Sequence, residues 1–495
     1  MPTHRHRHVD RLSALPDEVL ERILSHLPSD EATRTTSLSR RWRRVCDGVP
    51  VVDLVDRKID RQGRGRISLP VCFDSKVTGA IFSKGPTTPI HVLRLHARHP
   101  PDDLLDGWIA TAASSGAKEI DLALQYRHYS RRRLCPFDWF GKADFGEEVR
   151  GSYTTTPRQL FRCATLRRLR LANWTLDLPW GVVVAASLET LCLKRIMAPA
   201  AVLQQLVSSC PHLADLTLEE CPTATTITVS SNRLRSFAIV CCHNARRVVL
   251  RTQCLRSLRY KGGLPSDTIL DIPNYDEVAA LTIDICEDLT SKAPMEVAPV
   301  LELISRCKKL TYLHLELRPS MAYYSSEITA IARDHLPQLR HLVLKGFLAA
   351  DHVVRSVAVL VASTLHLEAL SLFPLGSETL KKTYYSDDEY GGNSDSDPEP
   401  EICDYEDDIY DDDWMLRSMW RWGIPCSRHS LKRINIAKYT GNGFDRILAN
   451  FLLSNGAALE EFSVTLAAPL SPRREEIAMM FRSWRHNPRT IVTCS

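Results

Sequence analysis

Three copies of one short pattern decide the fold of this chain: LRRLRL at residues 166–171, LETLCL at 188–193 and LADLTL at 213–218. Each copy has the form L-x-x-L-x-L. The last two leucines are two residues apart, so both point to the same face of a β-strand. The first leucine comes from the turn that enters the strand. Because one strand cannot bury this apolar face alone, the copies must stack against each other.

The same pattern recurs too often along the chain to be a coincidence. Weaker copies begin at Ile90 and Ala117, and later copies begin at Leu234, Leu255, Val278, Leu310, Leu339, Leu367, Leu431 and Leu459. From residue 166 onward, successive copies start 21 to 25 residues apart and then 28 to 32 residues apart, with one gap of 64. Periods of this length are typical of leucine-rich repeats. We therefore predict an α/β, horseshoe-like solenoid with parallel strands on its concave side.

The segments between these strands carry helix signals and cysteines. Apolar residues at helical spacing predict helices at 200–209, 298–306 and 444–455, whereas 231–250 lacks that spacing and is expected to form loops or extra strands. The chain has fifteen cysteines and no C-x-x-C pair, and five cysteines fall at fixed places in the repeats: Cys163, Cys210, Cys221, Cys242 and Cys307. Metal or redox chemistry is the alternative, but free cysteine packs as a small hydrophobe. We interpret them as buried thiols and predict no metal and no cofactor.

The first 60 residues predict three short helices. The first has apolar residues at helical spacing between Pro16, which suits a first helical position, and Pro28, which ends it. Ser29 and Ser39 are the expected N-caps of the second and third helix. Three helices this short bury too little surface to form a robust free domain. Some of their apolar side chains should therefore contact either a partner or the rest of the chain.

This segment resembles the F-box of plant F-box proteins. The matching elements stand in order over residues 10–55: Asp10, Leu15-Pro16-Asp17, Ile23-Leu24-Ser25, Leu27-Pro28, Glu31-Ala32, Leu38-Ser39, Arg41-Trp42-Arg43 and Pro50. The resemblance implies binding to a SKP-family adaptor, which links an F-box to the cullin and RING subunits of a ubiquitin ligase. It also implies that seven residues lie at or beside the adaptor interface: Leu15, Pro16, Leu20, Ile23, Leu24, Leu27 and Trp42.

The resemblance extends over most of the chain. Residues 102–124 are similar to the first repeat of plant F-box/leucine-rich-repeat proteins, and residues 430–469 are similar to the FBD module that ends many of them. The expected organisation is a disordered basic tail (1–9), the F-box (10–55), a leucine-rich-repeat solenoid (88–383), a disordered acidic insert (384–413) and C-terminal repeats resembling the FBD module (414–495).

The acidic insert interrupts the repeats. Residues 386–414 contain fourteen acidic residues and no lysine or arginine. A segment of like charge, rich in glycine, proline and serine, cannot bury enough apolar surface to fold. We expect a passive solvated loop; binding of a basic partner, or phosphates on Ser386, Ser394 or Ser396, are the alternatives.

The composition and the missing motifs argue against several other functions. The 63 Lys and Arg residues against 59 Asp and Glu give a net charge of only +4, so no nucleic-acid partner is expected. No run of eighteen apolar residues predicts a membrane span, and no apolar signal-peptide region begins the sequence, so we expect the cytoplasm or the nucleus. The motifs G-x-x-x-x-G-K-[ST], G-x-S-x-G and H-E-x-x-H do not occur. We predict no catalytic residue.

The function that the resemblance implies is that of a non-catalytic receptor. It would be the substrate-recognition subunit of an SCF-type (SKP adaptor–cullin–F-box) E3 ubiquitin ligase. The alternative is a leucine-rich-repeat scaffold that binds a partner without any ligase. In both cases the x positions of the strands face outward on the concave side, where we expect an unknown protein target. The expected target-binding residues are Arg168, Arg170, Arg259, Tyr312 and His314.

Overall fold

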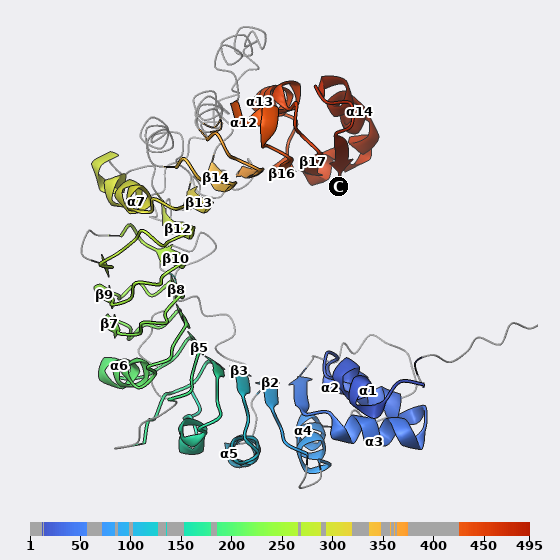
Figure 1. Ribbon diagram of the computed structural model, residues 1–495, viewed down its shortest axis with the longest axis vertical. Coiled ribbons are helices and arrows are strands. Elements are labelled where there is room, and N and C mark those ends of the chain that lie inside the picture. Colours follow the sequence, from blue (N-terminus) through green and yellow to red (C-terminus); the bar gives the residue numbers. More distant parts are fainter. Residues whose placement is uncertain are drawn as a thin grey trace, which may run out of the picture. The chain divides into compact units, whose positions relative to one another are not determined.

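The computed structural model divides into two compact units, which are described separately. Figure 1 labels the helices and strands of the chain. Unit 1 contains Met1–Leu134, Asp144–Leu234 and Asn244–Thr252, and unit 2 contains Cys135–Ala143, Arg235–His243 and Gln253–Ser495. The structure describes residues 12, 14–56, 72–84, 88–98, 102–126, 135, 153–179, 186–265, 269–288, 294–318, 336–347, 357, 361, 364–374 and 425–495. The basic tail (1–9) and the acidic insert (384–413) lie outside these residues, so their predictions stay predictions.

Unit 1 begins with three short helices that share a small core. They are α1 (Asp17–Leu24), α2 (Ser29–Arg34) and α3 (Arg40–Gly48), with the 3-10 helix η1 (Thr35–Ser37) after α2. The helix α1 is shorter than predicted: it ends at Leu24, with Ser25 as its C-cap, and does not continue to Pro28. Ser39 caps α3 as predicted, since its Oγ accepts a hydrogen bond from the Trp42 N–H at 3.3 Å.

The predicted N-cap role of Ser29 is wrong, and the reason is a link to the next strand. Ser29 is the first residue of α2, and its side chain makes no capping hydrogen bond. Its Oγ instead accepts a hydrogen bond from the Asp53 N–H at 2.8 Å. This bond joins the F-box helices to strand β1 (Val51–Val55), which the sequence analysis missed.

The sheet of unit 1 therefore starts inside the F-box segment. Strand β1 pairs in parallel with β2 (Val92–Arg98). The next strands pair in parallel in chain order: β3 (Glu119–Gln125), β4 (Arg168–Ala172), β5 (Thr190–Lys194) and β6 (Asp215–Glu219). Helical return segments are α4 (Phe73–Phe82), α5 (Asp102–Ser114), η3 (Arg158–Arg162) and α6 (Ala200–Ser208). Residues 231–250 were expected to return by loops or extra strands. The short strand β9 (Arg247–Leu250) lies there and pairs in parallel with β7 (Thr226–Val229), so the extra-strand alternative is confirmed.

Unit 2 repeats this parallel arrangement. Its strands pair in the order β8 (Ser236–Val240), β10 (Ser257–Gly262), β12 (Ala280–Asp288), β13 (Tyr312–Arg318), β14 (His341–Phe347), β15 (Ala369–Pro374), β16 (Arg433–Tyr439), β17 (Glu461–Leu466) and β18 (Ile491–Cys494). A two-residue strand, β11 (Leu270–Asp271), precedes β12. The return segments include α7 (Pro294–Arg306), α12 (Pro425–His429), α13 (Gly443–Asn455), η4 (Ala468–Arg473) and α14 (Arg474–Trp484). No helix in the described part of the chain is long and apolar enough to cross a membrane.

The leucine pattern sets the position of every predicted strand. In each copy from residue 166 to residue 459, the first apolar residue is at most 1% exposed, and the strand begins two residues later. Directly after four strands the backbone is left-handed, with positive φ at Asn173, Arg195, Glu220 and Cys241. These residues turn the chain out of the strand and into the return segment.

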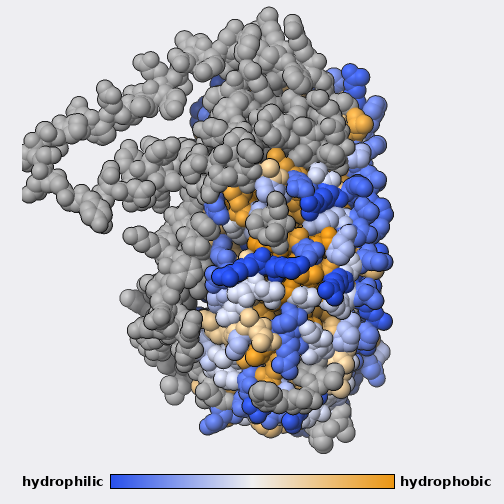
Figure 2. Space-filling view, turned by 90° about the vertical axis from the view of Figure 1, so that its left-hand side faces the viewer, coloured by the Kyte–Doolittle hydropathy of each residue, from blue (hydrophilic) through white to orange (hydrophobic). Residues whose placement is uncertain are grey.

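The surface of the protein carries both hydrophobic and hydrophilic residues. On the face shown in Figure 2, hydrophobic residues lie between hydrophilic ones in the part that is drawn in colour. Apolar atoms are common on any protein surface, so their presence on this face does not by itself mark a binding site.

The repeat cysteines are buried, as predicted. Cys163, Cys210, Cys221, Cys242 and Cys307 are at most 7% exposed. Burial raises the pKa of Cys210 and of Cys307 to about 12. Both thiols are therefore protonated and unreactive at neutral pH, which fits a packing role.

Candidate functional site

The predicted adaptor residues separate into buried and exposed groups. Three of them are at most 6% exposed and form the core of the F-box helices: Leu20, Leu24 and Trp42. Two more are partly buried and pack against this core: Leu15 and Leu27. The last two are exposed: Pro16 and Ile23. The buried residues thus hold the helices together, and the exposed ones are available to a partner.

Further apolar residues of the F-box are exposed that were not predicted to lie at the adaptor interface. Together with the predicted residues they form what we call the F-box surface: Leu12, Pro16, Val19, Ile23 and Leu38. Leu38 is 67% exposed and Val19 is 42% exposed. Pro16, Val19 and Ile23 follow one another at intervals of three and four residues, so they share one side of α1. This spacing could have revealed Val19, whereas Leu38 lies between two helices, where no periodicity signals it.

An ion pair fixes the start of α1 against α3. The Nε and Nη2 atoms of Arg41 each lie 2.7 Å from Oδ1 of Asp17, and Nη2 also donates a hydrogen bond to the Leu15 carbonyl. Both side chains are partly exposed, so the pair contributes little to stability. Its effect is geometric, because it positions the chain that leads into α1 and with it Pro16.

The outward-facing positions of unit 1 carry alternating charges. Arg94 on β2 lies 2.7 Å from Glu119 on β3. The predicted target residues Arg168 and Arg170 on β4 lie 3.6 Å from Glu119 and 3.9 Å from Asp121, respectively. The side chains of both β4 arginines are nevertheless more than half exposed. The arginines are thus accessible to a ligand, while the side chains of Glu119 and Asp121, at 20% and 15% exposure, are largely buried.

Unit 2 brings together the other three predicted target residues. Arg259 on β10 is exposed, and Tyr312 and His314 on β13 are half-buried. The strand β12 lies between β10 and β13, and its register places Arg259 and His314 in one row across the sheet. The ring of Tyr312 lies 6.4 Å from that of His341. Burial lowers the pKa of His314, so its imidazole is neutral at pH 7. The result is a surface that combines a cation with aromatic and neutral polar groups.

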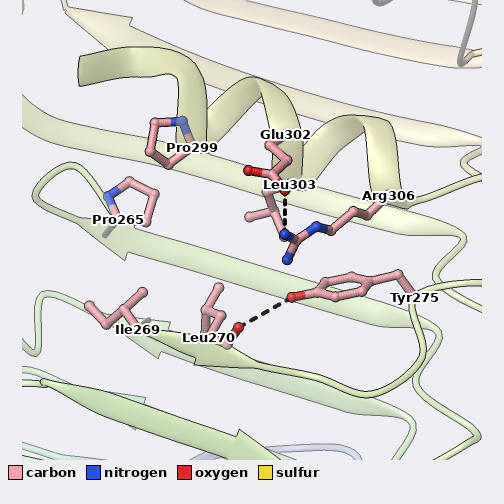
Figure 3. A pocket seen from close by; sticks show the side chains of 8 residues that line it. All are labelled: Pro265, Ile269, Leu270, Tyr275, Pro299, Glu302, Leu303 and Arg306. Carbon is pink, nitrogen blue, oxygen red and sulfur yellow. Dashed lines mark hydrogen bonds and ion pairs between the residues drawn. The ribbon is translucent and has the colours of Figure 1, made fainter. Parts of the chain in front are cut away.

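The pocket in Figure 3 is too small for an organic ligand. It lies beside α7 and is lined by Pro265, Ile269, Leu270, Tyr275, Pro299, Glu302, Leu303 and Arg306. Arg306 forms an ion pair with Glu302, and its guanidinium lies 5.8 Å from the centre of the Tyr275 ring. The pocket volume of about 30 Å³ is that of one or two water molecules, whereas ligand sites have several hundred Å³. This pocket gives no support for a small-molecule function.

Two protein-family models match this chain, one at the F-box helices and one in the repeats. The F-box domain model matches residues 12–53. The model for the LRR repeats of the FBD-associated F-box protein At5g56370 matches residues 105–269. The first match covers the three helices and the start of β1, and the second lies in the repeats that follow.

Several Arabidopsis thaliana proteins are similar to this chain. The F-box/LRR-repeat protein At5g35995 is 29% identical over 334 residues, which are 64% of this chain and 65% of that protein. The F-box/LRR-repeat protein At2g42720 is 26% identical over 336 residues, 64% of this chain and 69% of that protein. The FBD-associated F-box protein At5g56370 is 29% identical over 294 residues, 57% of this chain and 62% of that protein. The chain thus matches between 62% and 69% of the lengths of these three relatives.

The matches and the fold together define the class of protein. The chain carries an F-box followed by leucine-rich repeats of the FBD-associated kind, as the sequence predicted. The plant F-box/LRR-repeat and FBD-associated proteins of Arabidopsis are its homologues.

Proposed function

We propose that this chain is the substrate-recognition subunit of an SCF-type E3 ubiquitin ligase. Its F-box binds a SKP-family adaptor that carries the cullin and RING subunits, and its strand face binds a protein target. The observation that carries the proposal is the exposed F-box surface within the residues that the F-box model matches. Of the ten exposed large apolar residues in the described part of the chain, four lie there: Leu12, Val19, Ile23 and Leu38.

Covering the F-box surface favours association with a partner, whereas the core of the F-box helices is already formed without one. Covering apolar surface contributes about 25 cal/mol per Å², and a few central apolar anchors usually dominate an interface. Leu20 and Leu24 are already buried within the chain. The F-box can therefore bind an adaptor through its outer side chains without rearranging its own core.

In this proposal the chain supplies proximity and no chemistry. Within unit 1, polar contacts link the F-box helices to the segments that follow, in addition to the chain itself. Ser29 accepts a hydrogen bond from the backbone of β1, and Lys76 of α4 lies 3.3 Å from Asp30 of α2. Lys84 donates a hydrogen bond to the Val49 carbonyl. These contacts hold the F-box, and with it a bound adaptor, close to the first repeats. A target bound to those repeats is then presented to the ligase at high effective concentration.

The target surface in this proposal is the outward-facing side of the strands. Arginine and aromatic residues are enriched at the residues that dominate protein interfaces. Unit 1 offers Arg168 and Arg170, and unit 2 offers Arg259, Tyr312 and His314. Once a target is known, Arg168→Glu with Arg170→Glu, and Arg259→Glu with Tyr312→Ala, should each be scored for target capture. If both pairs leave capture unchanged, the strand face is not the target surface.

A pull-down with a SKP-family adaptor tests the adaptor half of the proposal. Ile23→Asp should abolish capture, because a charge buried at the interface without a partner costs several kcal/mol. Leu104→Asp is the matched control, since Leu104 on α5 has the same 41% exposure as Ile23 but lies outside the F-box. The control should capture the adaptor as well as the wild type does. If the wild type captures no adaptor, the chain is better explained as a scaffold without a ligase. If Ile23→Asp captures the adaptor as well as the wild type does, the F-box surface is wrongly assigned.

A further inference from the structure

Four side chains that could bind a metal ion meet in unit 2, although they come from three separate places in the sequence. Cys135, Cys241, His243 and Cys286 each offer one ligand atom, and the four atoms all lie within 4.8 Å of one another. The Sγ atoms of Cys241 and Cys286 are 3.9 Å apart. No spacing motif connects the four residues, which is why the sequence analysis predicted no metal ligand.

We propose that Cys135, Cys241, His243 and Cys286 bind a zinc ion. Three sulfurs and one imidazole nitrogen are a donor set of structural zinc sites, which are tetrahedral. With Zn–S bonds of about 2.3 Å, a tetrahedron separates two sulfurs by about 3.8 Å. The separation of 3.9 Å between Cys241 and Cys286 matches this value and far exceeds the disulfide bond length of about 2.05 Å. Ligand atoms that are 4.8 Å apart need to approach by only about 1 Å.

Three of the ligands are held by neighbouring strands of one sheet. Cys286 lies on β12, Cys241 directly follows β8, and His243 comes two residues later. The strand β10 lies between β8 and β12. The Cys241 N–H donates a hydrogen bond to the carbonyl of Lys261 on β10 at 2.6 Å, which fixes the turn that carries Cys241 and His243. A preformed arrangement of this kind reduces the ordering that metal binding requires.

Cys241 also differs from the residues at the equivalent turns of other repeats. The other non-glycine residues with positive φ in the described part of the chain are Asn173, Arg195, Glu220 and Lys438, and all of them are partly or fully exposed. Cys241 is only 7% exposed. In this turn a small thiol thus faces inward, toward two further cysteines and a histidine, where other repeats place a longer polar side chain.

The surroundings suit the charge of such a site. Three thiolates, a neutral imidazole and Zn²⁺ carry a net charge of −1, and the ammonium group of Lys261 is nearby. This ammonium group also forms an ion pair with Asp284. A cation beside the cysteines stabilises the thiolates that a zinc ion needs as ligands. With four protein ligands the site is closed, so zinc would stabilise the fold and perform no catalysis.

Zinc analysis of the purified full-length chain tests the proposal. The wild type, prepared without chelators, should contain about one zinc ion per chain by mass spectrometry of the metal. Cys286→Ser and His243→Ala should lose this zinc. Cys242→Ala is the matched control, because Cys242 is adjacent to Cys241 and equally buried but not part of the cluster, and it should keep its zinc.

Cobalt loading of the wild type provides a second readout that does not depend on the folding of a variant. Co²⁺ added to the metal-free chain should give the sulfur-to-cobalt charge-transfer band and the intense d–d bands of a tetrahedral thiolate site. The charge-transfer band distinguishes this cluster from the histidines of the N-terminal tail, which carry no sulfur. A wild type without zinc and without these bands overturns the proposal, and so does undiminished zinc in folded Cys286→Ser.

Discussion

Replacing both Ile23 and Leu38 by alanine should weaken adaptor binding by about 50- to 100-fold. Burying a whole isoleucine or leucine side chain contributes about 1.5–3 kcal/mol. Ile23 is 41% exposed and Leu38 is 67% exposed in the free chain. Covering the exposed part at an interface therefore contributes about 1 kcal/mol for Ile23 and about 1.5 kcal/mol for Leu38. If the two effects add, the total of about 2.5 kcal/mol corresponds to this change in Kd.

Calorimetric titration of the purified chain with a SKP-family adaptor measures this change directly. The free energy of unfolding should hardly change in the double variant, because both side chains are already largely in water. Leu20→Ala is the contrasting variant: Leu20 is fully buried, so its truncation should lower the free energy of unfolding by about 2–5 kcal/mol. If the double variant binds the adaptor as tightly as the wild type, Ile23 and Leu38 are not at the interface and the F-box surface is wrongly assigned.

Three further outcomes are expected. Ser29→Ala removes the hydrogen bond from the Asp53 N–H and should lower the free energy of unfolding, measured with denaturant, by about 1 kcal/mol. Ser25→Ala loses a hydrogen bond only within its own turn and should lower it less. Equal losses in the two variants would contradict the link to β1. Burial lowers the pKa of His314, so the unfolded chain binds a proton there more readily than the folded chain does. The free energy of unfolding should therefore decrease as the pH falls below about 6.5. His314→Gln should weaken this pH dependence, and an unchanged pH dependence in the variant would refute the assignment. Deleting residues 384–413 should leave the melting temperature nearly unchanged, and a fall of several degrees would show that the segment packs on the folded chain.

The repeats were predictable because their physics is local. Each strand needs two apolar residues two positions apart and one in the preceding turn, and every complete copy of this pattern became a strand. The strands β1 and β18 were missed because they stand at the two ends of the series. The segment of β1 was assigned to the F-box, where its alternating apolar residues were not separated from the helix pattern.

The division of the F-box residues into core and surface could not be predicted. Ile23 and Leu24 are adjacent, similar in size and equally apolar, yet one is 41% exposed and the other 2%. Which side of α1 faces inward depends on how α3 packs against it, and Trp42 decides this from a distant position in the sequence. A single helix pattern contains no information about that contact.

The cysteine cluster was hidden for a related reason. Cys241 and Cys286 meet only because β8, β10 and β12 lie side by side. The spacing between them depends on the irregular lengths of the return segments, so no fixed motif could reveal it. The repeat pattern predicted neighbouring strands but gave no reason to single out these turns.

Proximity labelling in cells with an inhibited proteasome tests the central claim most directly. Wild-type chain and Ile23→Asp would each be fused to the same labelling enzyme. We expect both chains to label the same target proteins, because the strand face is intact in both. Only the wild type should label the adaptor and the cullin, and only its targets should carry additional ubiquitin. If Ile23→Asp labels the ligase subunits and promotes target ubiquitination as the wild type does, the account is contradicted.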